Sequence, residues 1–218
     1  MVKTNGSSKR AALKLCVTAM FSALLVGGKQ ALAILPNVEV VTLLVAVCAF
    51  VWGLSVAMPA VFVFIAVDVA IWGINTWIIS YVIHWNVVAL CFWLLSKILK
   101  RKLSTAVFAT VTAVLLTVAF GVLTSAVDTV IGFTGSGFFT DFSQFFTRFA
   151  AVYVSGISFY VTHVVCNAAL FATAFLPLVL LNKKAKTKMF EQPLIDEERD
   201  QSTERRRFDQ QTERDDKQ

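Results

Sequence analysis

The strongest constraint on this chain is a series of long apolar segments that are separated by short polar, glycine-containing or basic breaks. A helix needs about 20 predominantly apolar residues to cross the hydrocarbon core of a bilayer. The apolar segments predict membrane helices over residues 11–34, 38–55, 59–74, 77–99, 104–132 and 148–182. The expected fold class is therefore all-α, a polytopic membrane protein with six transmembrane helices.

The breaks carry recognisable turn signals. Pro36 ends the first segment, because proline cannot continue a helix. Met58-Pro59 predicts a tight turn between the second and third segments, and Gly73 and Asn75 separate the third from the fourth. A glycine- and phenylalanine-rich loop precedes the sixth segment.

Composition supports this class. Hydrophobic residues make up 57% of the 218 residues and charged residues 16%, whereas a soluble domain carries about 25% charged residues. Residues 183–218 hold ten of the 20 Lys and Arg and ten of the 14 Asp and Glu, so residues 1–182 carry the whole net charge of +6. This apolar, charge-poor composition excludes a soluble enzyme, a disulfide scaffold and a nucleic-acid module. The basic residues also lie at segment ends rather than on one face, which is not the pattern of a DNA-binding surface.

The basic residues predict the orientation of the helices. They form three clusters, which comprise Lys3, Lys9, Arg10 and Lys14; Lys97, Lys100, Arg101 and Lys102; and Lys183, Lys184, Lys186 and Lys188. With six spans all three clusters fall on one side, which the positive-inside rule assigns to the cytoplasm. Both termini are expected to be cytoplasmic, in a prokaryotic plasma membrane.

This topology defines the expected parts of the chain. Residues 1–10 are a cytoplasmic N-terminal segment, 11–182 a six-helix membrane domain that binds substrate, and 183–218 a charged and disordered cytoplasmic tail. Ala31-Leu-Ala33 after a basic start imitates a signal-peptide cleavage site, but cleavage would put one chain end on the wrong side. The first apolar run is therefore interpreted as a membrane helix.

Polar and aromatic groups crowd the outer half of the predicted domain, where an outward-facing pocket for a solute is one interpretation. The predicted substrate-binding residues are Asn37, Glu39, Trp72, Asn75, Trp77, Tyr81, His84, Phe142 and Arg148. The alternative is an interfacial aromatic belt with internal ion pairs such as Lys29 with Asp128. If the site lies deeper, His163 and Asn167 are the expected residues.

The sequence contains no recognisable motif for catalysis, nucleotide binding or metal binding. It contains no Walker A motif, no His-Glu-x-x-His, no recognisable nucleophile with its base, and no paired-cysteine zinc motif. Cys16, Cys48, Cys91 and Cys166 are interpreted as small buried hydrophobes. We therefore expect no enzyme activity, no metal and no cofactor, and the chain itself offers no energy source for transport.

Two segments resemble the substrate-binding S components of energy-coupling factor (ECF) vitamin transporters. Lys29-Gln-Ala-Leu-Ala-Ile-Leu-Pro-Asn-Val-Glu-Val-Val-Thr-Leu-Leu-Val45 contains the Leu-Pro-Asn-Val-Glu turn of one branch of that family. Residues 153–167, with Ser-Gly-Ile, His163 and Asn167, look like its sixth helix, although Ser158 and Tyr160 stand where that branch has Pro and Asp. The resemblance covers roughly residues 10–185.

The resemblance implies a mechanism and partners. Such a subunit captures a vitamin from outside, docks on a transmembrane coupling subunit with two cytoplasmic ATPases, and releases the solute inside. Ala19, Ala23 and Gly27 match the small-residue motif by which the first helix contacts the coupling subunit. Cobalamin is the leading expectation for the ligand, with queuosine-type bases, other vitamins or a precursor as alternatives. A stand-alone secondary transporter and a membrane structural or assembly protein also remain open.

Overall fold

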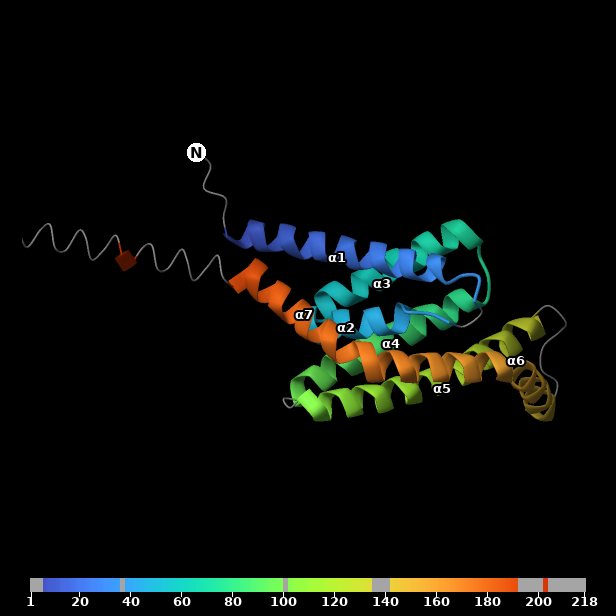
Figure 1. Cartoon of the computed structure of the whole chain (residues 1–218). Helices are drawn as coiled ribbons and strands as arrows, with labels where there is room; N and C mark the ends of the chain where they lie inside the picture. The colour runs from blue at the N-terminus through green and yellow to red at the C-terminus, as the bar shows by residue number, and fades with distance from the viewer. Residues whose placement is uncertain (1–5, 36–37, 100–101, 135–141, 192–201, 204–218) are drawn as a thin grey trace, which may run out of the picture.

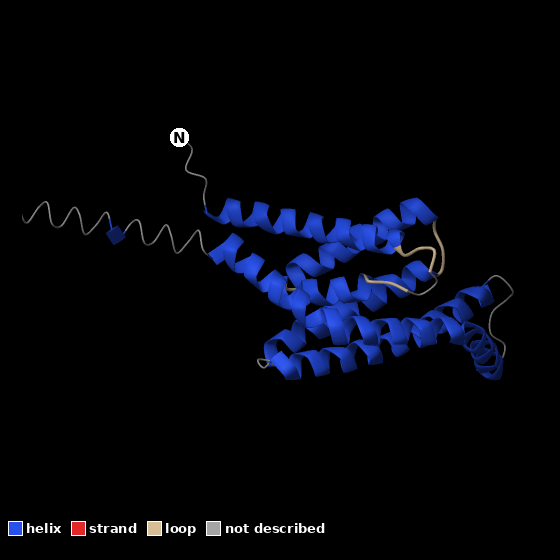
Figure 2. Ribbon diagram, viewed as in Figure 1, coloured by secondary structure: helices blue, strands red, loops and turns tan. Residues whose placement is uncertain are grey.

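The structure, a computed structural model, describes residues 6–35, 38–99, 102–134, 142–191 and 202–203. Its described secondary structure is entirely helical and contains no strand, as the all-α prediction requires (Figures 1 and 2). The elements are α1 (Gly6–Ala31), α2 (Val41–Trp52), α3 (Leu54–Trp72), α4 (Trp77–Ile98), α5 (Lys102–Thr134), α6 (Phe142–Leu170), the π-helical stretch η1 (Phe171–Phe175), α7 (Leu176–Lys186) and a second π-helical stretch, η2 (Thr187–Glu191).

Five helical stretches are long and apolar enough to cross a membrane. They are Ser8–Ala31, Leu54–Trp72, Trp77–Ile98, Ser104–Gly132 and Ser143–Phe190, the last running through α6, η1, α7 and part of η2. The chain is therefore compatible with a multi-pass membrane protein. The 12-residue α2 is apolar but extends only about 18 Å at 1.5 Å per residue, well short of the hydrocarbon core. The count of six spans stays a prediction.

The boundary between the second and third segments differs from the prediction. The turn expected at Met58-Pro59 is absent, because Pro59 lies inside α3. The chain instead turns at Gly53, whose positive φ of 84° is readily available only to glycine. Proline has no N–H group, so Pro59 leaves the carbonyl of Ser55, four residues earlier, without its helical hydrogen bond. Proline is tolerated in membrane helices when such a carbonyl finds another partner. Ser55 lies in the first turn of α3 and is exposed, so its carbonyl is not enclosed within the bundle.

The short helix α2 forms the centre of the bundle. Each of its residues except Leu44 is buried, and it packs against α3, α4 and α7 as well as α1. A helix that is apolar on every face belongs in the interior of a protein. Around it α1 packs on α3 and α5 packs on α6, while many large apolar side chains on the outer helices, such as Phe62 and Leu115, stay exposed. Such an outer surface suits a lipid environment.

The start of α1, the junction of α4 with α5 and the end of α7 lie at the same end of the bundle, on the left in Figure 1. The described basic side chains of this end include Lys97 and Lys183. Helix extends beyond both predicted limits of the membrane domain, from Gly6 to Glu191. Residues 192–201 and 204–218, which include most of the predicted disordered tail, lie outside the described residues.

The topology yields a labelling prediction. In a variant whose four cysteines are replaced by alanine, Lys97→Cys should resist a membrane-impermeant maleimide added to intact cells, because the positive-inside rule places it in the cytoplasm. Ile74→Cys is the matched control: it lies at the opposite end, is 90% exposed, and should be labelled. Labelling of Lys97→Cys but not Ile74→Cys from outside would show the inverted orientation.

Candidate functional site

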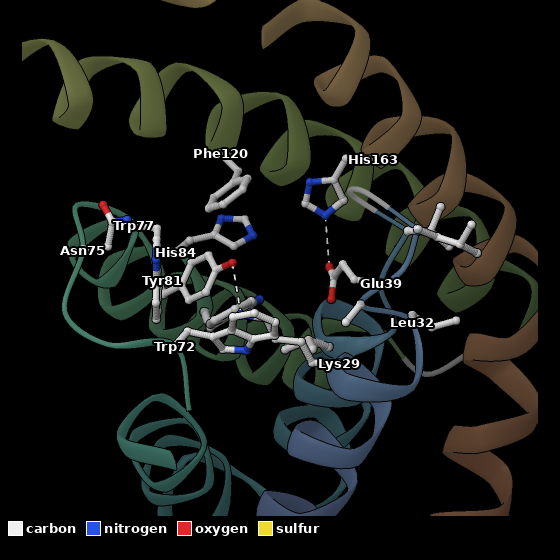
Figure 3. Close-up of a pocket in the computed structure, with 15 residues that line it drawn as sticks. Lys29, Leu32, Glu39, Trp72, Asn75, Trp77, Tyr81, His84, Phe120 and His163 are labelled. Carbon is white, nitrogen blue, oxygen red and sulfur yellow. Dashed lines mark hydrogen bonds and ion pairs between the residues drawn. The ribbon is translucent and has the colours of Figure 1, made fainter. Parts of the chain in front are cut away.

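A cavity of about 380 Å³ opens at the end of the bundle opposite the basic one (Figure 3). The end of α1, the connection to α2, the end of α3 and the first turns of α4 surround it, and α5 and α6 each contribute a ring. The lining residues are Lys29, Leu32, Ala33, Leu35, Val38, Glu39, Val41, Trp72, Asn75, Trp77, Tyr81, His84, Trp85, Phe120 and His163.

Aromatic side chains of α4 form one wall of the cavity. Trp77, Tyr81 and Trp85 recur every four residues and therefore share one helix face, with ring centroids 4.8 and 4.2 Å apart in sequence order. His84 extends this wall toward α5, where its ring lies 4.6 Å from that of Phe120. The wall offers a broad aromatic surface to a bound molecule.

An ion pair joins α1 and α3 beside this wall. Lys29 Nζ donates to Asp68 Oδ2 at 2.5 Å and to the Tyr81 hydroxyl at 3.3 Å, and it also lies 4.4 Å from the centroid of the Tyr81 ring. The expected pairing of Lys29 with Asp128 is wrong. Because α1 packs on α3, Asp68 is the carboxylate within reach.

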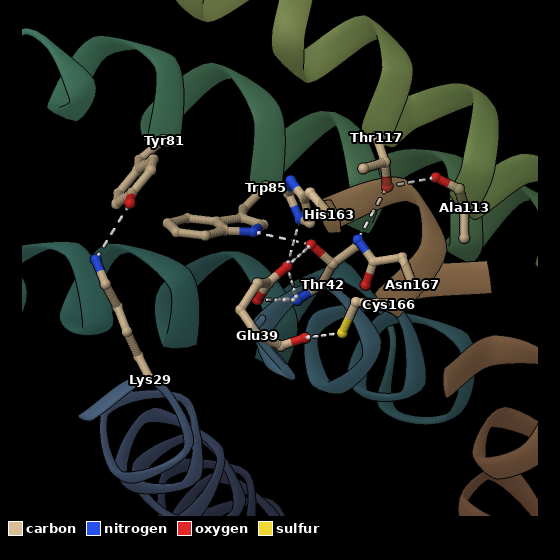
Figure 4. A network of polar contacts seen from close by, with 10 residues as sticks. All are labelled: Lys29, Glu39, Thr42, Tyr81, Trp85, Ala113, Thr117, His163, Cys166 and Asn167. Carbon is tan, nitrogen blue, oxygen red and sulfur yellow. Dashed lines mark hydrogen bonds and ion pairs between the residues drawn. The ribbon is translucent and has the colours of Figure 1, made fainter. Parts of the chain in front are cut away.

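A second polar cluster links the start of α2 to α6 (Figure 4). Glu39 Oε1 accepts from the Thr42 hydroxyl at 2.6 Å and from His163 Nε2 at 3.0 Å, and Oε2 accepts from the Thr42 amide at 3.1 Å. Because a carboxylate accepts, His163 carries its proton on Nε2. Glu39 thereby caps the first turn of α2, which is a favourable place for a negative charge.

Glu39 precedes α2 in the chain and is largely shielded from solvent. Burial alone would raise the pKa of its carboxyl group, but the hydrogen bond and charge of His163 and the two bonds from Thr42 together lower this pKa below its usual value. The group is therefore held as an anion.

The two residues of the deeper alternative site, His163 and Asn167, lie in different surroundings. His163 lines the same cavity as the predicted outer residues. Asn167 lies one turn further along α6, where its amide donates to the Thr117 hydroxyl at 2.9 Å, and that hydroxyl donates to the Ala113 carbonyl. Asn167 therefore ties α6 to α5 below the cavity rather than lining it.

The structure brings most of the described predicted site residues together. The cavity is lined by Glu39, Trp72, Asn75, Trp77, Tyr81 and His84. Arg148 is not among the lining residues: its guanidinium lies beside Gly132, between α5 and α6. Asn37 lies outside the described residues, as does the side chain of Phe142, the first residue of α6.

Several lining residues are not predicted from the sequence, and three of them are charged or aromatic: Lys29, Trp85 and Phe120. Phe120 is not predicted, because apolar residues are distributed around the whole of α5 and do not by themselves indicate which face turns inward. Trp85 is not among the predicted binding residues, and Lys29 is expected only in an ion pair. Their places follow from the four-residue repeat on α4 and from the pairing of Lys29 with Asp68.

In the described part of the chain, no three His, Cys, Asp or Glu side chains gather closely enough to hold a metal ion. Cys48 is buried as expected, whereas Cys16 is exposed on α1 and Cys91 and Cys166 are partly exposed, so the expectation of buried cysteines is wrong for these three.

No model of a known protein family, no curated protein and no solved structure matches this chain.

Proposed function

We propose that the chain is the substrate-capture subunit of an ECF-type importer in the cell membrane, where it binds a vitamin or related micronutrient from outside. It then delivers the solute inward by docking on a transmembrane coupling subunit that carries two cytoplasmic ATPases. The observation that carries this proposal is the aromatic cavity at the end of the bundle opposite the basic clusters. Under the positive-inside rule, that end faces the exterior.

The cavity has the character of a ligand site. Such sites are concave, predominantly apolar or aromatic, and contain a few polar groups that fix the orientation of the ligand. Here the rings of Trp77, Tyr81 and Phe120 stand beside the polar side chains of Glu39 and His84. The lining comes from several different helices, so binding would depend on the assembled bundle.

The volume of the cavity bears on the choice of ligand. At about 380 Å³ it lies near the lower limit of the roughly 300–1,000 Å³ that is typical for drug-sized ligands. Cobalamin, a large macrocycle with bulky substituents, would require this end of the bundle to open. Among the ligands that the resemblance leaves open, the cavity therefore favours the smaller vitamins, bases or precursors.

The proposed contact with the coupling subunit is a stripe on α1. Ala19, Ala23 and Gly27 recur every four residues, and all three are exposed in the isolated chain. A Cβ atom added to Gly27 would meet nothing within 4 Å. Small residues at this spacing allow another membrane helix to approach closely.

Bulky residues on this stripe should abolish transport but not binding. The double variant Ala19→Trp, Ala23→Trp is expected to lose ATP-dependent uptake in cells that express the coupling module, because the indole rings hold the partner helix away. Calorimetric titration of the isolated variant should give the wild-type affinity. The matched control, Val107→Trp with Val111→Trp, places two indoles four residues apart on the exposed side of α5. If the α1 double variant still takes up solute and the α5 double variant does not, the contact with the coupling subunit would be assigned to α5.

A stand-alone secondary transporter is the second candidate, favoured by the Glu39–His163 pair on the cavity wall. A paired carboxylate and imidazole can accept and release a proton during transport. Purified protein in sealed vesicles, without ATPases, distinguishes the two functions. Accumulation of solute driven by a pH gradient alone would support the second candidate, and uptake only with the ATPase module supports the first.

A further inference from the structure

We propose that the cavity takes a compact, flat and uncharged heteroaromatic ring system that hydrogen-bonds to Nε2 of His84. This inference rests on the proposed function, since it names the class of solute that the same cavity captures. It is carried by three observations: an unpartnered nitrogen on the wall, charges that are already paired, and a small space bounded by rings.

The unpartnered nitrogen belongs to His84. The side chain is 4% exposed and lines the cavity, yet Nε2 has no hydrogen-bond partner within the part of the chain that the structure describes. A buried polar atom without a partner is costly, so such an atom on a cavity wall indicates a ligand group that completes it. Depending on the tautomer, neutral imidazole donates or accepts at Nε2. A ring edge that bears both a carbonyl and an N–H group suits either case.

The charged groups of the lining need no counter-charge from a ligand. Lys29 is paired with Asp68 and also donates to the Tyr81 hydroxyl. Glu39 already accepts hydrogen bonds from Thr42 and His163. A ligand that carried a net charge into this space would lose its hydration without gaining an unpaired partner. The lining therefore discriminates in favour of an uncharged ligand.

The shape of the space favours a flat ring. In Figure 3 the rings of Tyr81 and His84 stand on one side of the space and Glu39 faces them from the other. Phe120 and His163, whose ring centroids are 5.5 Å apart, contact each other at one end of it. A ring inserted between the two sides would lie against aromatic surface and present one edge to His84. Offset or edge-on contacts between aromatic rings add stabilisation beyond simple burial. A space of about 380 Å³ favours a compact ring over a macrocycle.

The test compares probes of matched shape and different charge by calorimetric titration of the full-length protein in lipid nanodiscs. The matched sets are nicotinamide with anionic nicotinate and cationic 1-methylnicotinamide, hypoxanthine with the urate anion, and riboflavin with its phosphate, alongside cyanocobalamin. We expect saturable binding of at least one uncharged ring, and binding of its charged counterpart that is at least about tenfold weaker, equivalent to about 1.4 kcal/mol.

Variants at His84 then test the hydrogen bond. His84→Phe keeps a ring but removes the nitrogen, and it should weaken binding of the uncharged probe about threefold to tenfold. His84→Gln, which places a polar atom near the position of Nε2, should restore part of the affinity. Ser80→Ala is the matched control: Ser80 also lies on α4 and has a buried, unpartnered hydroxyl among the described residues, but it does not line the cavity. The Ser80→Ala variant should bind the uncharged probe with wild-type affinity.

The contradicting results separate the inference from the function on which it rests. Tighter binding of a charged probe than of its neutral counterpart, saturable binding of cyanocobalamin, no binding of any uncharged ring, or wild-type affinity in His84→Phe would each overturn the ligand class. Binding of a charged probe or of cyanocobalamin that Ala33→Trp abolishes would still leave the cavity as the capture site. Binding that persists unchanged in Ala33→Trp would overturn the proposed function of the cavity itself.

Discussion

Replacing Lys29 by methionine is expected to destabilise the protein by about 3–5 kcal/mol, because the Asp68 carboxylate would then remain buried without its counter-charge. Asp68 is 1% exposed, and the Lys29 ammonium group is its charged partner at 2.5 Å. Methionine retains a long, unbranched apolar stem, so that the change removes mainly the charge. The free energy of unfolding can be measured by titrating mixed micelles with SDS.

Two further variants isolate the cause of this loss. The double variant Lys29→Met, Asp68→Leu removes both charges and should recover most of the stability, because replacing a buried ion pair by apolar residues is often neutral or stabilising. Lys97→Met, at an exposed lysine of α4, should change stability by no more than about 0.5 kcal/mol. A Lys29→Met protein as stable as Lys97→Met would show that the ion pair contributes nothing to the fold.

Filling the cavity from its own wall should abolish ligand binding. Ala33 lines the cavity and is exposed, so Ala33→Trp places an indole at its entrance without displacing a core residue. In calorimetric titrations with the compound released from the wild-type protein, we expect the affinity to fall by more than about 100-fold, or roughly 2.8 kcal/mol. The bound ring and the indole would compete for the same space of about 380 Å³.

The neighbouring residue provides the control for this variant. Ile34 is 90% exposed and does not line the cavity, so Ile34→Trp adds the same side chain one residue along the same connection. It should bind the compound with wild-type affinity. Equal loss of affinity in both variants would show that the connection between α1 and α2, rather than occupation of the cavity, controls binding.

The fold class could be predicted from the sequence, but several helix boundaries could not: α6, for example, begins at Phe142 inside the predicted loop rather than at residue 148. The apolar segments are long enough to identify helices regardless of their packing, which is why α4 and α5 match their expected ranges closely. The sequence pattern predicts a break at Pro59, because proline usually disrupts a helix. Whether a proline ends a membrane helix depends on where its freed carbonyl points, and that is decided by tertiary structure. Gly53 carries the turn instead.

The candidate site residues were predicted from their depth in the membrane. The errors in that prediction arise because the sequence does not show which side of each helix turns toward the cavity. Sequence spacing places Trp77, Tyr81 and His84 near the outer end of the fourth segment, and this estimate needs no knowledge of packing. The direction of Phe120 around the axis of α5 cannot be obtained in the same way, because apolar residues are distributed around that helix. The sequence also does not show that Arg148 of α6 lies beside Gly132 of α5. The partner of Lys29 likewise depends on which helices are neighbours.

The most direct test is mass spectrometry of the small molecules released from the protein after purification without added ligand. The account predicts that the wild type and Ile34→Trp release the same compound in near-equimolar amount, and that Ala33→Trp releases none of it. A wild-type protein that releases no small molecule, or an Ala33→Trp protein that releases the same compound in the same amount, would contradict the claim that this cavity captures a solute.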